Sequence, residues 1–320
     1  MKIIRKKIIC VLFFSIAINA FAQIKGKDFK AVDEFVKKTG ALDSLTMGTI
    51  SEIITKPFTD KTDKARAIFD WIAYNISYDC KAGRTGNTDK NSSTEVLLYR
   101  KGLGIGYATL FQDMCSSANI RCLTVDGYVK TSTEEINDSK TDINHSWAVV
   151  QLGQSPDDWY YIDPAWGSGY TDADMKIFTR SFNDAYFFSD KPIFNLQHYP
   201  DNEAWKLGSA PKNIKDFYDL PLIKAAAYEF ELKKFTPASG FVKAKVGKQQ
   251  SFSFSLDSKA QVNKVSLMIG MPKKQKMKEV NFSFDKGTLV FSYTFQEDNG
   301  YPVTVLINGK ELATYYFEVE

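Results

Sequence analysis

Apolar residues recur at helical spacing in the first two thirds of the chain. Residues 63–75 carry such a pattern, which predicts a helix with Thr62 as its N-cap. Residues 105–118 carry a longer stripe and predict the strongest helix in the chain; its members are Tyr107, Leu110, Phe111, Met114, Cys115 and Ala118. Three strands are predicted to follow this helix, over residues 121–129, 146–152 and 159–162.

The pattern changes near residue 232, after which only strand-like alternation and short apolar runs remain. The Asn308-Gly309 pair suits a tight hairpin, because both residue types accept positive φ. Seven short strands in fewer than ninety residues are typical of an immunoglobulin-like sandwich. We therefore predict an α+β domain over residues 23–231 and an all-β domain over residues 232–320. The seven strands are expected at residues 241–246, 251–256, 262–269, 280–284, 289–295, 302–307 and 312–319.

Residues 1–22 are typical of a secretory leader. Four basic residues precede the apolar run 8–18, and Ala20-Phe21-Ala22 forms a small-x-small cleavage site before Gln23. The apolar run is shorter than the ~20 residues that span a membrane, and no later segment is apolar enough to span. We therefore expect an exported protein without a transmembrane segment, located in a periplasm or outside the cell.

Charge excludes some classes of protein and divides the chain. The full chain has a net charge of +3, and removal of the leader leaves −1. This near-neutral balance argues against a nucleic-acid binder, and 44% hydrophobic residues argue against a disordered protein. The first domain carries −6 and the second +5. This split is either chance surface charge, or a sign that the domains dock electrostatically or that Lys273, Lys274, Lys276 and Lys278 meet an anionic envelope surface.

A glycine-rich turn at Gly102, Gly104 and Gly106 resembles a dinucleotide-binding fingerprint. The spacing fails, because the third glycine of that motif would stand where the chain has Tyr107 or Thr109. We expect no cofactor and no metal ion.

A histidine and an aspartate flank a predicted hairpin. His145 begins one strand and Asp163 follows the end of the next, so antiparallel pairing makes them neighbours. A carboxylate beside an imidazole fixes its tautomer and stabilises its cation, as in a nucleophilic triad. A lone histidine is usually structural, but this arrangement favours a functional site.

Several segments together resemble the transglutaminase-like superfamily of papain-type fold, most closely its kyphoscoliosis-peptidase-like branch. The resemblance covers about half the chain, between residues 65 and 220. A sandwich domain often follows in this branch. The segments that carry it are residues 67–72, 76–79, 100–108, 123–130, 145–150, 159–167, 182–188, 198–201, 205–207 and 217–220.

The resemblance implies a cysteine nucleophile at a helix start, followed by a histidine and an aspartate. His145 and Asp163 match the last two, whereas the cysteine position is Gly104, which has no side chain to attack a carbonyl. Cys80 is expected in a loop and is the one thiol with freedom to reach the site. Cys115 and Cys122 are expected to fill the core or to pair with each other, and the odd number of mature cysteines leaves at least one free thiol or an intermolecular pair.

These observations favour a secreted pseudoenzyme that binds a polypeptide or a cell-envelope component in the inherited cleft. Backbone N–H groups at the helix start can hold a ligand oxygen, and Trp147, Trp166 and Tyr107 are candidates to line the cleft. One alternative is a weakly active hydrolase or acyltransferase that uses His145 and Asp163, or Cys80. Another is a purely structural surface protein. The sequence does not predict the oligomeric state.

Overall fold

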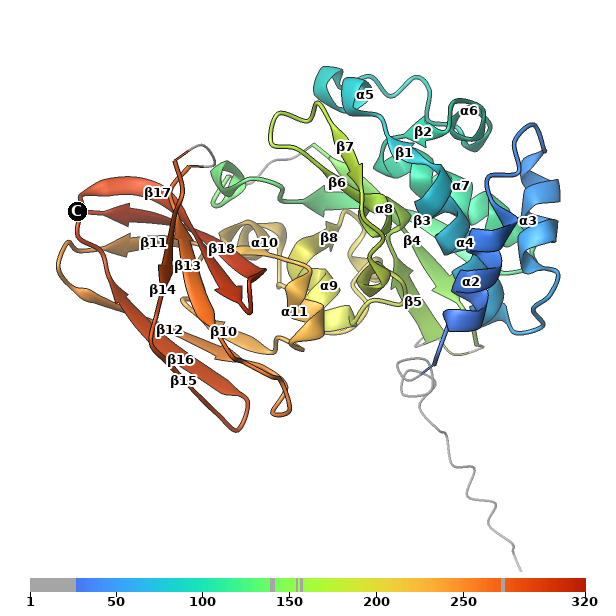
Figure 1. Cartoon of the computed structure of the whole chain (residues 1–320). Coiled ribbons are helices and arrows are strands. Elements are labelled where there is room, and N and C mark those ends of the chain that lie inside the picture. Colours follow the sequence, from blue (N-terminus) through green and yellow to red (C-terminus); the bar gives the residue numbers. More distant parts are fainter. Residues whose placement is uncertain (1–26, 139–141, 154, 156–157, 272–273) are drawn as a thin grey trace, which may run out of the picture.

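The computed structural model describes residues 27–138, 142–153, 155, 158–271 and 274–320. The predicted leader, part of the hairpin turn after residue 153 and Lys273 lie outside these residues. Figure 1 shows a mixed helix-and-strand part followed by a β-sandwich. Among the described residues, no helix is both long and apolar enough to cross a bilayer.

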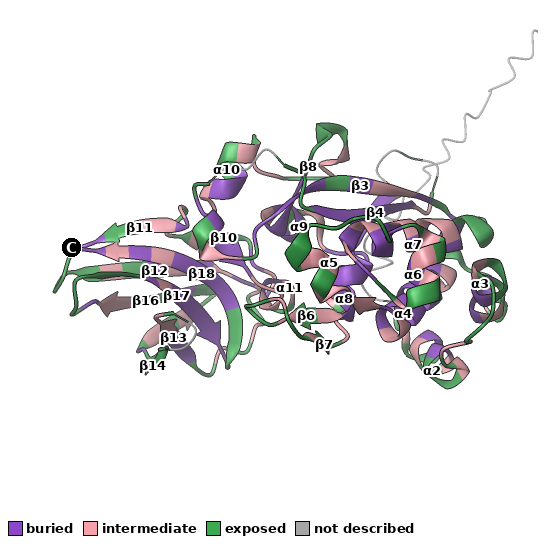
Figure 2. Ribbon diagram, turned by 90° about the horizontal axis from the view of Figure 1, so that it is seen from above, coloured by how far each residue is buried: buried purple, intermediate pink, exposed green. Residues whose placement is uncertain are grey.

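The first part is built on a four-stranded antiparallel sheet with the order β5-β4-β3-β8. Its strands are β3 (Arg121–Val129), β4 (His145–Gln151), β5 (Trp159–Ile162) and β8 (His198–Pro200). The three strands predicted after the long helix are therefore confirmed, and the middle one begins one residue earlier. Almost all of β4 is buried, as its colouring in Figure 2 shows, because helices cover both faces of the sheet.

Helix α7 (Gly104–Ser117) packs on one face of this sheet, and α4 (Lys61–Asn75) packs against α7. Helix α9 (Lys191–Gln197) covers the other face. The other helical and strand elements of this part are α2 (Lys30–Thr39), α3 (Met47–Thr55), β1 (Ser77–Tyr78), α5 (Cys80–Thr85), α6 (Ser93–Tyr99), β2 (Lys101–Gly102), η1 (Thr133–Glu135), α8 (Pro164–Ser168), β6 (Gly169–Thr171), β7 (Phe178–Arg180), η3 (Asp184–Tyr186), η4 (Glu203–Trp205) and α10 (Ile214–Asp219).

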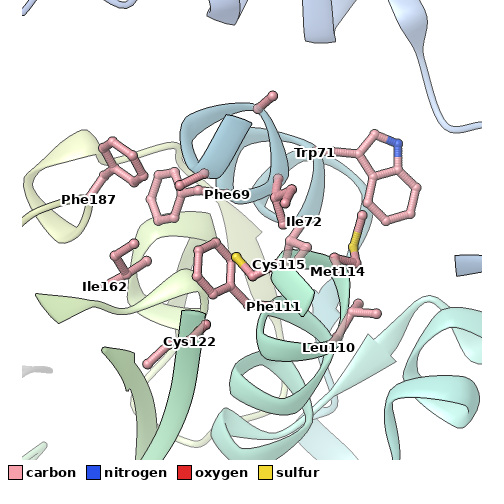
Figure 3. Close-up of a cluster of buried hydrophobic side chains, with 14 of the residues drawn as sticks. Phe69, Trp71, Ile72, Leu110, Phe111, Met114, Cys115, Cys122, Ile162 and Phe187 are labelled. Atoms are coloured by element: carbon pink, nitrogen blue, oxygen red, sulfur yellow. The ribbon is translucent and has the colours of Figure 1, made fainter. Parts of the chain in front are cut away.

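The two predicted helices exist, with different starts. Asp60, not Thr62, is the N-cap of α4, because the Asp60 carboxylate accepts a 2.7 Å hydrogen bond from the Thr62 N–H. The carboxylate also lies at the positive end of the helix dipole. The α7 stripe is buried as predicted from Tyr107 to Cys115, and Figure 3 shows part of it packed against Phe69 and Ile72 of α4. This packing fixes where the start of α7 lies.

The cysteines Cys80, Cys115 and Cys122 are all free thiols in the structure. Cys115 and Cys122 are buried in the core, so they fill it and do not pair. We expect mass spectrometry after alkylation in denaturant to find all three modified. Without denaturant, we expect the half-buried Cys80 to react first, because the other two need local unfolding. A disulfide-linked peptide between Cys115 and Cys122 would contradict this.

The second part is a sandwich of two sheets, β10-β12-β16-β15 and β11-β18-β17-β13-β14. All seven predicted strands exist, with shifted ends, and β10 and β14 are additional. The Asn308-Gly309 hairpin is confirmed, since both residues have positive φ and Ile307 pairs with Lys310. The strands are β10 (Lys234–Thr236), β11 (Phe241–Ala244), β12 (Gln249–Ser255), β13 (Val265–Ile269), β14 (Lys276–Glu279), β15 (Phe282–Asp285), β16 (Thr288–Thr294), β17 (Asn299–Ile307) and β18 (Lys310–Val319).

The two parts meet through a short connecting segment. Strand β9 (Leu222–Ile223) pairs with β18, and helix α11 (Ala226–Glu229) follows it. Ile223, Phe230 and Leu232 are buried in the core of the sandwich. An exposed ion pair between Lys310 and Glu229 links the oppositely charged parts in the described portion of the chain. Burial of apolar side chains therefore holds this junction more than charge does. The division at residue 231 stays a prediction.

Candidate functional site

His145 and Asp163 come together where the β4–β5 hairpin meets α8. His145 is the first residue of β4, and Asp163 is the N-cap of α8, where its Oδ1 accepts a 2.9 Å bond from the Trp166 N–H. The His145 Nε2 lies 2.7 Å from Asp163 Oδ2. The contact expected from the hairpin is therefore present, and Asp163 is held from two sides.

A second histidine, which sequence reasoning did not assign to the site, shares the same carboxylate oxygen. The Nε2 of His198 lies 3.0 Å from Asp163 Oδ2, and its ring stacks on Phe194 with centroids 3.9 Å apart. His198 begins β8, which reaches the site by pairing with β3. The signal available in the sequence was slight: His198 is the one other histidine, and it lies in a segment that carries the family resemblance.

Burial and hydrogen bonding set the charges of this cluster. Burial alone would raise the pKa of Asp163, but the charge of His145 and hydrogen bonds from both imidazoles lower that pKa below its usual range. Burial lowers the pKa of His198 to about 4, despite its bond to Asp163. At neutral pH His198 is therefore neutral and donates its Nε2 proton to an ionised Asp163. Its buried Nδ1 has no partner among the described residues.

The lowered pKa of His198 makes a testable prediction about stability. The folded state binds fewer protons than the unfolded state between pH 6.5 and 4, so the free energy of unfolding falls as the pH falls through this window. We expect the His198 contribution to fall by about 3 kcal/mol between pH 7 and pH 4. Urea unfolding at several pH values gives the free energy of unfolding of the unaltered protein and of His198→Gln. The change with pH in the difference between these two free energies measures the His198 contribution.

Comparing the two proteins removes contributions from other groups. Burial raises the pKa of Asp70 to about 9, so Asp70 makes the free energy of unfolding rise as the pH falls. This contribution is the same in both proteins and cancels in the difference. Parallel stability curves for the two proteins would show that His198 titrates normally in the folded state.

Gly104, the first residue of α7, lies directly against His145. A Cβ atom on Gly104 would stand 2.6 Å from the His145 Nδ1 and 2.8 Å from its Cε1. Real Cβ atoms do not approach so closely, so any side chain at this position must displace the imidazole. Only 7% of the His145 side chain is exposed. The space that a residue-104 side chain would need is therefore filled by His145.

The start of α7 has no side-chain cap. Its N-cap is Leu103, which has no side-chain hydrogen-bonding group, and the Leu103 N–H donates to the Asn91 Oδ1 at 2.7 Å. The first N–H groups of the 14-residue helix therefore lie beside the imidazole without a capping side chain. They carry the positive end of the helix dipole.

The aromatic residues expected to line a cleft have different environments. Tyr107 is fully buried, and its hydroxyl donates to the Ile76 carbonyl at 2.9 Å. Trp147 is also fully buried, with its ring 5.2 Å from the His198 ring. The structure therefore places these two in the core. Trp166 is half-buried, and its ring centroid lies 5.7 Å from that of His145.

Cys80 is placed at the start of a helix instead of in a loop. Parallel pairing of Tyr78 with Gly102 brings the start of α5 toward the start of α7. Burial and the nearby Asp172 and Asp79 raise the pKa of the Cys80 thiol, against the effect of Arg84. An activated thiol requires the opposite shift.

The same three side chains form a potential metal-ligand set. One ligand atom from each of His145, Asp163 and His198 lies within 4.8 Å of the others. Two imidazoles and a carboxylate suit zinc or a neighbouring transition metal. However, both imidazole–carboxylate contacts have hydrogen-bond lengths, which account for these atoms without an ion.

A helix start, a histidine and a carboxylate meet here in the order that the resemblance to papain-type proteins implies, with glycine at the helix start. Residues 48–164 match the family described as the transglutaminase-like superfamily, and this range includes Gly104, His145 and Asp163. These residues therefore form a transglutaminase-like domain.

Its curated relatives include kyphoscoliosis peptidases. The human protein is 29% identical over 223 residues, which cover 69% of this chain and 33% of that protein. The mouse protein is 30% identical over 200 residues, which cover 62% of this chain and 30% of that protein. The chain therefore spans about a third of the length of these relatives. A crystal structure of a TGase covers 61% of this chain and 45% of its own, at 15% identity and a TM-score of 0.30, too distant for inference.

Proposed function

We propose that this protein is an exported pseudoenzyme that binds a polypeptide or a cell-envelope ligand without covalent catalysis. The observation that carries the proposal is the contact between Gly104 and the His145 Nδ1. An imidazole that activates a nucleophile has a ring nitrogen within hydrogen-bond reach of it, and here the Nδ1 of His145 faces a residue without a side chain. His145 and Asp163 are then the remaining pair of the inherited site.

The nearby hydroxyls and thiols do not replace the missing nucleophile. The hydroxyl of Thr109 donates to the Ile105 carbonyl within α7. Cys115 is fully buried, and burial raises its pKa well above the usual value. The pKa of Cys80 is raised as well. Each of these groups lacks either the position or the activation that nucleophilic catalysis requires.

The start of α7 supports binding of a ligand oxygen. Its uncapped N–H groups can hold a carbonyl or carboxylate oxygen, which the helix dipole also favours, and a protonated His145 would add its Nδ1–H as a further donor. Because His145 is nearly buried, binding requires its ring to turn away from Gly104. The partly exposed Trp166 would then offer an apolar surface beside the ligand.

Catalysis is tested with a glutamine-containing peptide and a primary amine, with mass spectrometry of the isopeptide product. We expect no product above the buffer control. Turnover that His145→Ala abolishes would refute the no-catalysis claim. If Cys80→Ser or thiol alkylation abolished that turnover too, Cys80 would be the nucleophile.

Binding is tested by titrating ¹⁵N-histidine-labelled protein with an acetylated tetra-alanine peptide that ends in a carboxylate, and with its amide. We expect the His145 Nδ1 signal to move, and more with the carboxylate. A purely structural protein is the second candidate, favoured by the fit of the His145 ring against Gly104. It predicts no shift with either peptide.

A further inference from the structure

A groove runs along the junction between the two parts of the molecule, away from the site described above. It consists of two hollows of about 240 and 540 Å³ that share Asp190, Ile193 and Glu231, and we call it the junction groove. Figure 1 shows α9, α10 and α11, which contribute to it, between the first sheet and the sandwich. None of Gly104, His145 or Asp163 lines either hollow.

Apolar side chains form most of the wall of the junction groove. Ile193 and Leu232 are each 3% exposed and belong to the core of the sandwich. Leu196 and Leu220 are half-buried and line the larger hollow. A volume of about 540 Å³ lies in the ~300–1,000 Å³ range of ligand sites, which favour domain junctions.

Three aspartates of the groove have no ionic partner among the described residues. Asp184, Asp190 and Asp216 line it and form no ion pair with any residue that the structure describes. Asp190 accepts a hydrogen bond from the Ile193 N–H, and Asp216 accepts one from Asn213. These bonds use some of the hydrogen-bond acceptor positions of the two carboxylates but bring no positive charge to balance them.

The basic residues of the groove are mostly neutralised by acids outside it. Lys27 pairs with Asp60 and Asp63. Arg66 pairs with Asp33. Lys233 is the one base of the groove that forms no ion pair among the described residues. Three carboxylates without an ion pair therefore face one such lysine in the described groove, a balance that favours cations.

We propose that the junction groove is a second binding site, which takes an extended peptide segment with lysine or arginine side chains next to apolar ones. The apolar wall accepts the apolar side chains. Asp184, Asp190 and Asp216 accept the cationic groups at intervals along both hollows. Removal of the peptide's apolar surface from water supplies affinity, and the charges supply specificity and salt dependence.

The test uses the full chain and two fluorescein-labelled hexapeptides, in which leucine and proline alternate with lysine in one and glutamate in the other. Fluorescence anisotropy is expected to show at least tenfold tighter binding of the lysine peptide, weakened by salt. The triple variant Asp184→Asn/Asp190→Asn/Asp216→Asn should weaken that binding at least tenfold. Asparagine keeps the helix-capping function, so the fold should persist.

The matched control neutralises three exposed carboxylates away from the groove, in Asp89→Asn/Asp285→Asn/Asp298→Asn. It changes the net charge by the same amount and should leave binding within twofold. Equal binding of the two peptides, or equal losses in the two triple variants, would overturn the proposal. Sedimentation that shows a dimer, lost in the groove variant alone, would also overturn it by assigning the groove to a second copy of the chain.

Discussion

Asp163→Ala is expected to lower the free energy of unfolding by about 3–5 kcal/mol, because it leaves buried imidazole donors unsatisfied and removes a helix cap. The Asp163 side chain is fully buried and accepts hydrogen bonds from His145, His198 and the Trp166 N–H. Without it, two buried imidazoles lose their acceptor and α8 loses its cap. Urea unfolding at pH 7, followed by circular dichroism, measures the change.

Asp60→Ala is the matched control for the loss of a helix cap. Asp60 caps α4 through the Thr62 N–H, but 52% of its side chain is exposed and it contacts no imidazole. Its removal should cost about 1 kcal/mol. A loss for Asp163→Ala no larger than for Asp60→Ala would mean that the two imidazoles contribute nothing to stability through Asp163.

The site could be predicted from sequence only where its contacts are local. His145 and Asp163 flank one hairpin, so strand pairing alone makes them neighbours. His198 reaches the same carboxylate because β8 pairs with β3, a contact between segments about seventy residues apart with no signature in the local pattern. Sequence reasoning therefore found one imidazole partner of Asp163 and missed the other.

The restriction to local signals also explains where the predicted and observed folds differ. Apolar residues recur at helical spacing along α7 and alternate with polar residues in β12 and β16, so these elements could be predicted. The four residues of β14 are all exposed, and lysine alternates there with other residues, so no apolar signal marks the strand. The burial of Tyr107 and Trp147 depends on which helices cover each face of the sheet, which periodicity does not reveal.

Gly104→Cys is expected to create a thiol that stays ionised at unusually low pH. The new side chain would lie at a helix start beside the His145 Nδ1, and both features lower a thiol pKa. The His145 ring must first move aside, since a Cβ atom would otherwise stand 2.6 Å from Nδ1. This crowding should cost about 1–3 kcal/mol of stability, which Gly104→Ala measures separately.

The pH profile of alkylation by iodoacetamide is the appropriate measurement, because a thiolate of low pKa is also a weaker nucleophile and absolute rates mislead. Ile105→Cys is the control, one residue further along α7 and half-buried. A thiol with a pKa near 8.5 should react about 1,000-fold more slowly at pH 5.5 than at its plateau. The Gly104→Cys rate should fall less than tenfold over the same range.

Both variants are made in a Cys80→Ser background, so that the half-buried native thiol does not contribute. Adding His145→Ala to Gly104→Cys should restore the ordinary profile, because the imidazolium that stabilises the thiolate is then absent. If the Gly104→Cys profile instead matched that of Ile105→Cys, position 104 would not be the nucleophile position. The glycine would then be a packing residue, and the inherited-site proposal would fail with it.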